Sequence, residues 1–459
     1  MSSDTKTASF INDLTEGPVA KKLLYFALPF MLSNLLQTVY NMVDMSVVGH
    51  YVGSAGMSAV SVGGRLVELL TLMCTGFVTG GQILLSQQVG ARQKDAMQKT
   101  IGTLFTFILL VAVLAAVICI AFHRTMLTWM NTPAEAFEQA ASYMSICSLG
   151  LFFVFGYNAL CAVLRGMGDS KRPLLFVAVS SIVNLILDLI FVAGLGLGAA
   201  GAAAATAIAQ FISFITALVF LIIRRESFGF TFSRATLRID GSTLKTLTKL
   251  GLPLALQHAA ITVSMLFVNS FINSYGAAAS AVYGAGTKLQ NIPSIITGGL
   301  SMANASMVGQ NMAAGKPERV RKSVRTCFVF AASVYGIFIF LCLTVPRLIF
   351  MIFTTDPEVL ELAPIFLRIS SLGFAASIFN SSFNSVINGI GFTSLSMTIG
   401  LLDGVVGRIC FSLLFGLALG MGFNGFLLGN SLAIWITAIL ATAYYFSGKW
   451  KTRRLAVHH

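Results

Sequence analysis

Long apolar stretches recur along the chain and are separated by short polar connections. A helix that crosses a bilayer needs about 20 mostly apolar residues, and twelve of the stretches meet this length. The longest polar connection, from Arg224 to Lys249, lies in the middle and divides the helices six plus six. The pattern predicts helices over residues 23–49, 56–86, 100–122, 140–164, 173–196, 199–223, 247–274, 278–308, 322–345, 361–388, 394–418 and 423–446. We therefore expect an all-α polytopic membrane protein with twelve transmembrane helices.

The two halves are related by an internal repeat. Several short matches coincide after a shift of 223 or 224 positions: Leu28-Pro29 with Leu252-Pro253, Gln87 with Gln310, Lys99 with Lys322, and Ser148-Leu149-Gly150 with Ser371-Leu372-Gly373. Each half has an even number of spans, so both enter the membrane in the same direction, related by a pseudo-twofold axis along the membrane normal. Parallel repeats of this kind are typical of transporters whose two lobes face a central cavity.

Charge is distributed unevenly between the connections. The chain has 30 Lys and Arg against 17 Asp and Glu, a net charge of +13. In a soluble protein this excess would suggest nucleic acid, but here the basic residues cluster in every second connection, as the positive-inside rule requires. We expect no nucleic-acid partner, a multi-pass protein of the cell (inner) membrane, and cytoplasmic termini. The predicted segments are a cytoplasmic N-terminal segment at 1–22, an N-lobe at 23–223, a cytoplasmic linker at 224–246, a C-lobe at 247–446 and a basic cytoplasmic tail at 447–459.

Composition narrows the class further. Hydrophobic residues make up 56% of the chain and charged residues 10%, against about 25% charged in soluble domains. The seven cysteines all fall in apolar stretches, which favours packing over metal binding or disulfides. We find no cleavable signal peptide, and we interpret His458-His459 as a frayed tail. The chain also lacks HExxH, GxSxG and aspartate-rich prenyl-diphosphate motifs, so we expect no enzyme.

Polar residues inside the predicted spans form stripes. On the first helix Ser33, Gln37, Asn41 and Asp44 recur at i, i+4, i+8 and i+11, which places them on one face. The fifth helix repeats the pattern with Ser181, Asn184 and Asp188, and the sixth carries Thr206 and Gln210. Charges are costly at the bilayer centre, so these faces are expected to line a cavity or a helix contact rather than to meet lipid.

Asp44 and Asp188 admit two interpretations. They could be neutral acids whose hydrogen bonds lock helices together. We favour function, because a carboxyl group in an apolar cavity holds its proton more tightly than one in water. The oxygen atoms of Asp44, Asn184, Asp188 and Thr206 could equally bind a dehydrated Na+, and the sequence leaves the two ions open. No other metal site is expected.

Other intramembrane residues have weaker predictions. Arg65 and Glu68 are spaced for mutual neutralisation, whereas Asp403 and Arg408 are five apart and are not expected to share a face of an α-helix. For that second pair we leave open a structural or gating role and no role. His258 is either a core histidine or a cavity residue. Pro29 could bend the first helix as a hinge, although tolerated curvature is the alternative. On the tenth helix a polar stripe serves helix contact or substrate contact: Asn380, Asn384 and Asn388.

Four runs carry a resemblance to a known family. They are LTEGPVAKKLLYFALPFMLSNLLQTVYNMVDMSVVGHYVG from Leu14, SQQVGARQKD, RGMGDSKRP, and GQNMAAGKPERV in the second half. Together they resemble the MATE family of multidrug and toxic compound extrusion antiporters, over about residues 14 to 446. The resemblance implies a two-lobed secondary active exporter that expels cationic amphipathic compounds by alternating access in exchange for H+ or Na+.

The resemblance also implies roles for particular residues. Asp44 matches the central acid of the first helix, and Asn184, Asp188 and Thr206 match the cation-coupling set of the DinF-like branch. The NorM-like branch has further acids in the C-lobe, but here Ile261 and Ser377 stand near their places, so we expect coupling in the N-lobe. The expected substrate cavity comprises Gln37, Tyr40, Asn41, Gln210, Gln257, His258, Asn380 and Asn384.

Two alternatives remain at this point. A lipid-linked oligosaccharide flippase of the same superfamily would need cations to bind pyrophosphate, yet the deep polar groups are mostly acids and amides. An intramembrane enzyme would leave the repeat unexplained. We expect a monomer in the lipid bilayer that uses no cofactor apart from H+ or Na+ as the coupling ion.

Overall fold

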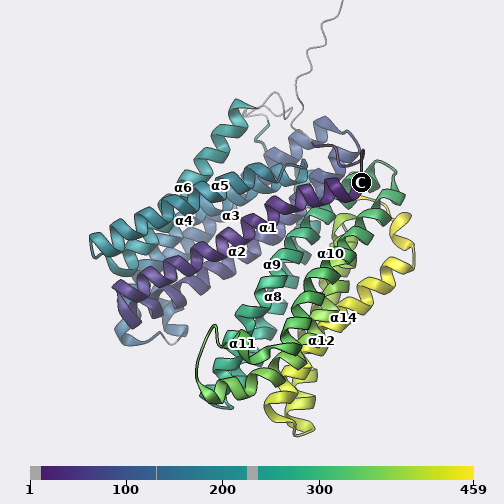
Figure 1. Ribbon diagram of the computed structural model, residues 1–459. Coiled ribbons are helices and arrows are strands. Elements are labelled where there is room, and N and C mark those ends of the chain that lie inside the picture. The colour runs from purple at the N-terminus through teal and green to yellow at the C-terminus, as the bar shows by residue number, and fades with distance from the viewer. Residues whose placement is uncertain (1–11, 131, 225–235, 459) are drawn as a thin grey trace, which may run out of the picture. The chain divides into compact units, whose positions relative to one another are not determined.

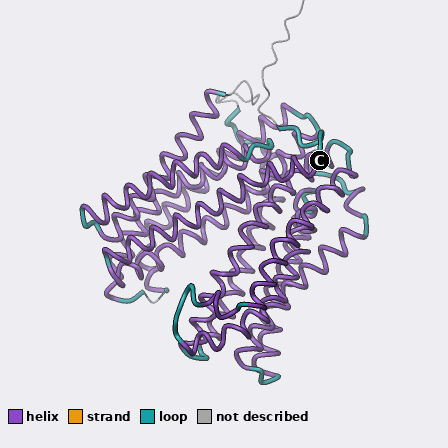
Figure 2. Tube along the Cα trace, in the orientation of Figure 1, coloured by secondary structure: helices purple, strands orange, loops and turns teal. Residues whose placement is uncertain are grey.

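The computed structural model describes residues 12–130, 132–224 and 236–458. In these ranges the chain is almost entirely helical, and Figure 2 shows helices joined by short loops with no strand. The predicted all-α class is therefore confirmed. Parts of the predicted N-terminal segment (1–11), of the linker (225–235) and of the tail (459) lie outside the described residues.

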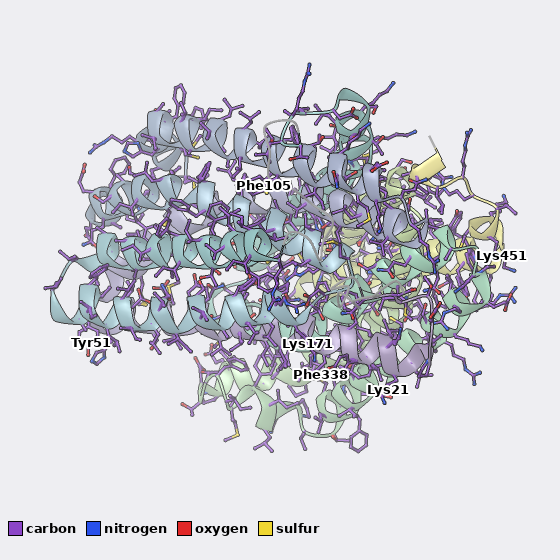
Figure 3. All side chains as sticks on the ribbon, turned by 90° about the horizontal axis from the view of Figure 1, so that it is seen from above. Lys21, Tyr51, Phe105, Lys171, Phe338 and Lys451 are labelled. Carbon is purple, nitrogen blue, oxygen red and sulfur yellow. The ribbon has the colours of Figure 1, made fainter. Side chains whose placement is uncertain are left out.

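The described chain divides into two compact units. Unit 1 comprises residues 12–13 and 32–251, and unit 2 comprises residues 14–31 and 252–458, within the described ranges. The long helices of unit 1 are α1 (Val19–Tyr51, from Leu32 onward), α2 (Gly53–Gly90), α3 (Lys94–Trp129), α4 (Ala134–Gly166), α5 (Lys171–Asp188) with the π-helix η1 (Leu189–Gly194), and α6 (Gly198–Ile223). Figure 1 shows these helices side by side, and Figure 3 places Tyr51 and Lys171 at opposite ends of them.

Unit 2 repeats this series of helices. Its elements are α8 (Gly241–Asn273, from Leu252 onward), α9 (Ala277–Ala313), α10 (Pro317–Thr344), the short α11 (Pro346–Phe350), α12 (Pro357–Gly389), α13 (Thr393–Leu401), the π-helices η2 (Leu402–Phe411) and η3 (Leu414–Ala418), α14 (Gly422–Phe446), and the 3₁₀ turns η4 (Lys449–Lys451) and η5 (Ala456–His458). The predicted eleventh helix is thus α-helical at its start and π-helical over much of the rest. The hydropathy pattern cannot reveal this change in the number of residues per turn.

Eleven segments of the described chain are long and apolar enough to span a membrane. The twelfth predicted span is α9, which has the length but is more polar. It carries Lys288 and several amides, some of them fully buried: Asn304, Gln310 and Asn311. Interior amides of this kind are satisfied by neighbouring helices rather than by lipid. Asn304, for example, donates to Ser385 Oγ of α12 at 2.7 Å.

The units differ from the predicted lobes at the first helix of each half. The start of α1 belongs to unit 2, where the backbone around Met31 packs closely on Gly299 of α9. The start of α8 belongs to unit 1, where a Cβ on Gly251 would lie 2.6 Å from Phe77 Cα of α2. The first division falls between Met31 and Leu32, just after Pro29, and the second between Gly251 and Leu252, just before Pro253. Each division therefore lies within three residues of the proline that is repeated in the two halves.

The loop before α1 is fixed by the second-half motif GQNMAAGKPERV. The guanidinium of Arg319 donates to the carbonyl oxygens of Leu14, Glu16 and Gly17 at 3.1, 3.0 and 2.8 Å. Asn311 donates to Leu14 O at 3.2 Å, and the Lys316 ammonium to Thr15 O at 3.1 Å. This motif therefore has a structural role, since it satisfies carbonyl groups ahead of the helix.

One close helix contact occurs in both units. A Cβ on Gly389 of α12 would lie 2.5 Å from the carbonyl oxygen of Ala305, and a Cβ on Gly166 of α4 would lie 2.8 Å from Leu85 Cβ and 3.0 Å from the carbonyl oxygen of Gln82. Shifts of 223 residues relate Gly166 to Gly389 and Gln82 to Ala305. Only glycine fits, because the opposing atoms are backbone or Cβ atoms that cannot rotate away.

Gly389→Ala should therefore destabilise the protein, by about 1–3 kcal/mol as overpacked cores do. The measurement is the thermal unfolding temperature of the purified protein in detergent. Gly298→Ala in α9 is the control, because an added Cβ there meets nothing within 4 Å. Equal unfolding temperatures for the two variants would contradict the close approach.

Candidate functional site

One acidic side chain of α1 is buried in unit 1. Asp44 retains 9% of its accessible surface, while Gln37 and Asn41 of the same stripe are exposed. Its Oδ1 atom is buried and accepts no hydrogen bond from the described donors. Burying a charged carboxylate without a hydrogen-bond partner on this atom costs free energy, and either a proton or a bound cation would reduce that cost.

A second buried acid completes a pair. Asp188 is the last residue of α5, at the point where the backbone enters η1, and it is 1% exposed. Its two carboxyl oxygens accept no hydrogen bond from the described donors, yet its carboxyl group lies within hydrogen-bonding reach of Asp44. Two carboxyl groups can form a hydrogen bond only when one of them carries a proton. A hydrogen bond between Asp44 and Asp188 would therefore require a proton on one of the two groups.

Polar groups of α1, α5 and α6 surround the pair. Asn184 is 2% exposed, and its Nδ2 atom lies 3.4 Å from Thr206 Oγ1, which is a long hydrogen bond. The Tyr40 hydroxyl interacts with Thr206 and electrostatically with Asp44 and Asp188. The four residues predicted for cation coupling thus lie together in unit 1. Gln210 lies one turn beyond Thr206 and is half-buried.

Two residues of α4 join this cluster that the sequence analysis did not propose. Tyr143 is 7% exposed and interacts with Cys147 and electrostatically with Asp44 and Tyr40. Cys147 is 8% exposed and interacts electrostatically with Asp44. Their spacing of four residues on α4 was the available signal, but a tyrosine and a cysteine in an apolar run are indistinguishable from core residues.

In the described part of the chain, no basic side chain forms an ion pair with the acidic pair. The ion pairs seen among the described residues include Arg124–Glu138, Arg172–Asp169, Arg321–Glu318 and Arg408–Asp403. None of them includes Asp44 or Asp188. The cluster consists of two acids among hydroxyl, amide and thiol groups, so its net charge depends on whether the two acids are protonated.

The remaining residues of the predicted substrate cavity belong to unit 2. Gln257 is buried against Gly400 of α13, and His258 beside it is exposed. Asn380 is half-buried. Asn384 Oδ1 lies 3.0 Å from Ser396 Oγ, a contact between α12 and α13. Asn384 therefore takes part in helix contact, one of the two roles considered for its stripe.

Pro29 lies inside α1, in the part that belongs to unit 2, and the helix continues through it to Tyr51. The hinge stays a prediction. Among the cysteines, six are buried as expected for packing residues, whereas Cys410 is exposed on η2.

Two predictions about charged pairs are wrong. Arg65 and Glu68 are both exposed and form no ion pair with each other, although their spacing permits one. Asp403 and Arg408 do share a face: Arg408 Nε donates to Asp403 Oδ1 at 3.1 Å. The reason is η2, because hydrogen bonds from i to i+5 bring residues five apart into line.

Comparison with known proteins agrees with this fold. The sequence model of the MatE family matches residues 29–190 and 253–414, one match in each half of the chain. The probable multidrug resistance protein YpnP of Bacillus subtilis is 28% identical over 446 residues, covering 96% of this chain and 98% of the relative. The probable multidrug resistance protein NorM of Thermotoga maritima is 24% identical and covers 95% of this chain and 94% of the relative.

Solved structures show the same fold. A multidrug resistance MATE family transporter of the MOP superfamily, in an outward-facing conformation, matches with a TM-score of 0.90 at 20% identity, covering 98% of this chain and 99% of that chain. A MATE structure in a bent conformation also matches with a TM-score of 0.90 at 20% identity, covering 97% of this chain and 99% of that chain.

Proposed function

This chain belongs to the MatE family, and from that premise we propose that it is a secondary active multidrug exporter. It expels cationic amphipathic compounds in exchange for a coupling cation, and the coupling site is the cluster of Asp44, Asn184, Asp188 and Thr206 in unit 1. The observation that carries the proposal is the pair of buried carboxyl groups within hydrogen-bonding reach of each other, which form no ion pair with any described basic residue.

The coupling ion that we propose is the proton. Two buried carboxylates repel each other strongly, and one shared proton relieves most of this repulsion. Na+ would instead be bound by oxygen atoms of both acids and of Asn184 and Thr206. Na+ is therefore the alternative outcome of the test below.

Exchange follows from competition for one negative charge. A lipophilic cation binds the cluster when the acids are deprotonated, and proton binding removes the charge that attracts it. Tyr40 offers an aromatic face beside the acids, and the exposed amides of Gln37 and Asn41 continue the polar stripe along α1. Each ligand thus favours the state of the protein from which the other has departed, as alternating access requires.

Orientation and assembly are part of the proposal. The chain is a multi-pass membrane protein, and its bacterial relatives support the cell membrane as its location. We place the termini in the cytoplasm, because the basic clusters fall in the connections on that side. A monomer suffices, since one chain supplies both repeats.

The two alternatives receive no specific support. A flippase for lipid-linked oligosaccharides would need cations that bind pyrophosphate, whereas the buried cluster of unit 1 is acidic. Enzymatic activity is excluded by membership in a family of transporters.

The test is transport in proteoliposomes with the two ion gradients imposed separately. A lipophilic cationic dye such as ethidium should be moved against its gradient when an inward-directed proton gradient is applied, and not when only a Na+ gradient is applied. Anionic dyes of similar size serve as the substrate control. Transport driven by Na+ alone would assign the cluster to Na+, and no transport of cations under either gradient would reject the exporter.

A further inference from the structure

The helices that carry the acidic pair have structural equivalents in unit 2 at a fixed shift of 224 residues. The backbone N–H of Leu195 donates to Ile190 O at 2.8 Å, and that of Leu419 donates to Leu414 O at 2.9 Å. Glycines with positive φ follow at the same places: Gly196 and Gly198 in unit 1, and Gly420 and Gly422 in unit 2. The shift therefore identifies which residue of unit 2 corresponds to each residue of the cluster.

At this shift one polar contact of the cluster has a counterpart. Asn184 corresponds to Arg408, and Thr206 corresponds to Asn430. Asn184 Nδ2 lies 3.4 Å from Thr206 Oγ1, and Arg408 Nη1 donates to Asn430 Oδ1 at 2.8 Å. The same two positions are bridged in both units, but in unit 2 the donor is a guanidinium group.

The two acids of the cluster have no acidic counterpart. Asp44 corresponds to Val268, and Asp188 corresponds to Ser412. The negative charge of unit 2 comes instead from Asp403, whose Oδ1 accepts from Arg408 Nε at 3.1 Å and whose Oδ2 accepts from Thr437 at 3.3 Å. Asp403 and Arg408 are 4% and 5% exposed.

The π-helix η2 makes this arrangement possible. With hydrogen bonds from i to i+5, Asp403 and Arg408 on one helix can meet side by side. The acid and its cation are then part of the same segment, so the cation cannot leave. In unit 1 the π-helix η1 begins only after Asp188, and no basic residue within 12–130, 132–224 and 236–458 forms an ion pair with the acids.

We infer that the guanidinium of Arg408 is a built-in cation that permanently occupies the unit 2 counterpart of the coupling site. Building on the proposed function, this inference assigns all cation exchange to unit 1. It also gives the unit 2 site a chemical class: a pocket that fits a guanidinium ion, in which the carboxylate of Asp403 and the amide oxygen of Asn430 accept hydrogen bonds from it.

Few other ionisable groups face the pair. Tyr283 of α9, which is 5% exposed, interacts electrostatically with Arg408. On the side of α8, the residues close to Gly400 and Gly404 are uncharged: Gln257, Ala260 and Ser264. The charge of Asp403 is therefore balanced by Arg408 alone among the described groups around it, and removal of the guanidinium should leave a site that requires a cation.

The experiment compares the thermal unfolding of purified wild type, Arg408→Ala and the double variant Asp403→Ala/Arg408→Ala. Millimolar guanidinium chloride should raise the unfolding temperature of Arg408→Ala by about 2 °C or more, a shift that corresponds to about 1 kcal/mol in a domain of this size. Urea at the same concentration is the matched probe, because it has the shape of guanidinium without its charge. Wild type and the double variant should show no such rise.

A missing response in Arg408→Ala, or an equal response in the double variant, would overturn the inference. If Arg408→Ala does not fold, the double variant Asp403→Leu/Arg408→Met, which replaces both charges by apolar side chains, tests the inference instead. Replacing both members of a buried ion pair by apolar residues is often tolerated, whereas an uncompensated buried charge is not. Folding of the neutral variant supports charge compensation as the role of Arg408, and failure of both variants contradicts it.

The neutral variant also gives a transport readout. The rate of its proton-driven dye transport should stay within about twofold of the wild-type rate. A loss of about tenfold, which corresponds to about 1.4 kcal/mol, would show that the pair contributes to transport. Loss of proton dependence in a folded neutral variant would mean that unit 2 exchanges cations, against the inference. If a proton gradient does not drive transport by the wild type, the proposed function is wrong. The role of Arg408 is still tested, because the unfolding experiment with guanidinium does not depend on transport.

Discussion

Asp44→Asn should abolish proton-driven efflux and leave the protein folded and inserted. Asparagine keeps the shape of the side chain but cannot release a proton, so the pair with Asp188 loses the charge that attracts a cationic substrate. Dye efflux from proteoliposomes under an imposed pH gradient should fall to the level of liposomes without protein, a loss of about 100-fold or more if the lost charge contributes about 3 kcal/mol.

Two matched variants control for the loss of an acid. Asp95→Asn makes the same chemical change at an exposed residue in the first turn of α3, and Glu68→Gln removes an exposed acid of α2 that forms no ion pair with the described residues. Both should transport at rates close to wild type. Efflux by Asp44→Asn at the wild-type rate would show that coupling does not pass through this residue.

The sequence was sufficient to predict most of the fold. Apolar runs of about 20 residues separated by short polar connections identify spanning helices, and the constant shift between the halves reveals the repeat. The units of the structure differ from the predicted lobes where specific side-chain contacts, rather than hydropathy, determine which unit a segment packs in. The start of α1 belongs to unit 2 because Arg319 and Asn311 hold the preceding loop there, and such contacts across about 300 residues leave no local pattern.

Only some residues of the candidate site could be identified from the sequence, because some of them have no distinctive sequence pattern. Asp44, Asp188 and Asn184 are conspicuous because polar residues are rare in apolar helices, and periodicity alone places them on interior faces. Tyr143 and Cys147 were missed because their types are common in helix cores. The Asp403–Arg408 pair was misjudged because the prediction assumed 3.6 residues per turn, and a π-helix changes which residues meet.

Substrate affinity should depend on pH, and the dependence should require both acids of the cluster. If one proton and one cationic substrate compete for the Asp44–Asp188 pair, the dissociation constant of the substrate rises as pH falls, by up to about tenfold for each pH unit once the pair is protonated. The sign follows from the order of binding: the substrate needs the negative charge, and the proton removes it. Fluorescence titration of purified protein with a cationic dye, at several pH values and with Na+ present or absent, measures this dependence.

The variants Asp188→Asn and Asp44→Asn separate the pair from its surroundings. Each leaves a single carboxyl group without its acidic neighbour, so the coupled titration is lost and the affinity should change much less with pH than in wild type. Asp95→Asn should keep the wild-type dependence, because its carboxyl group is exposed on α3. A pH dependence that survives in both Asp188→Asn and Asp44→Asn would move the competing proton away from unit 1, and an affinity that responds to Na+ at constant pH would replace the proton by Na+ in the same cluster.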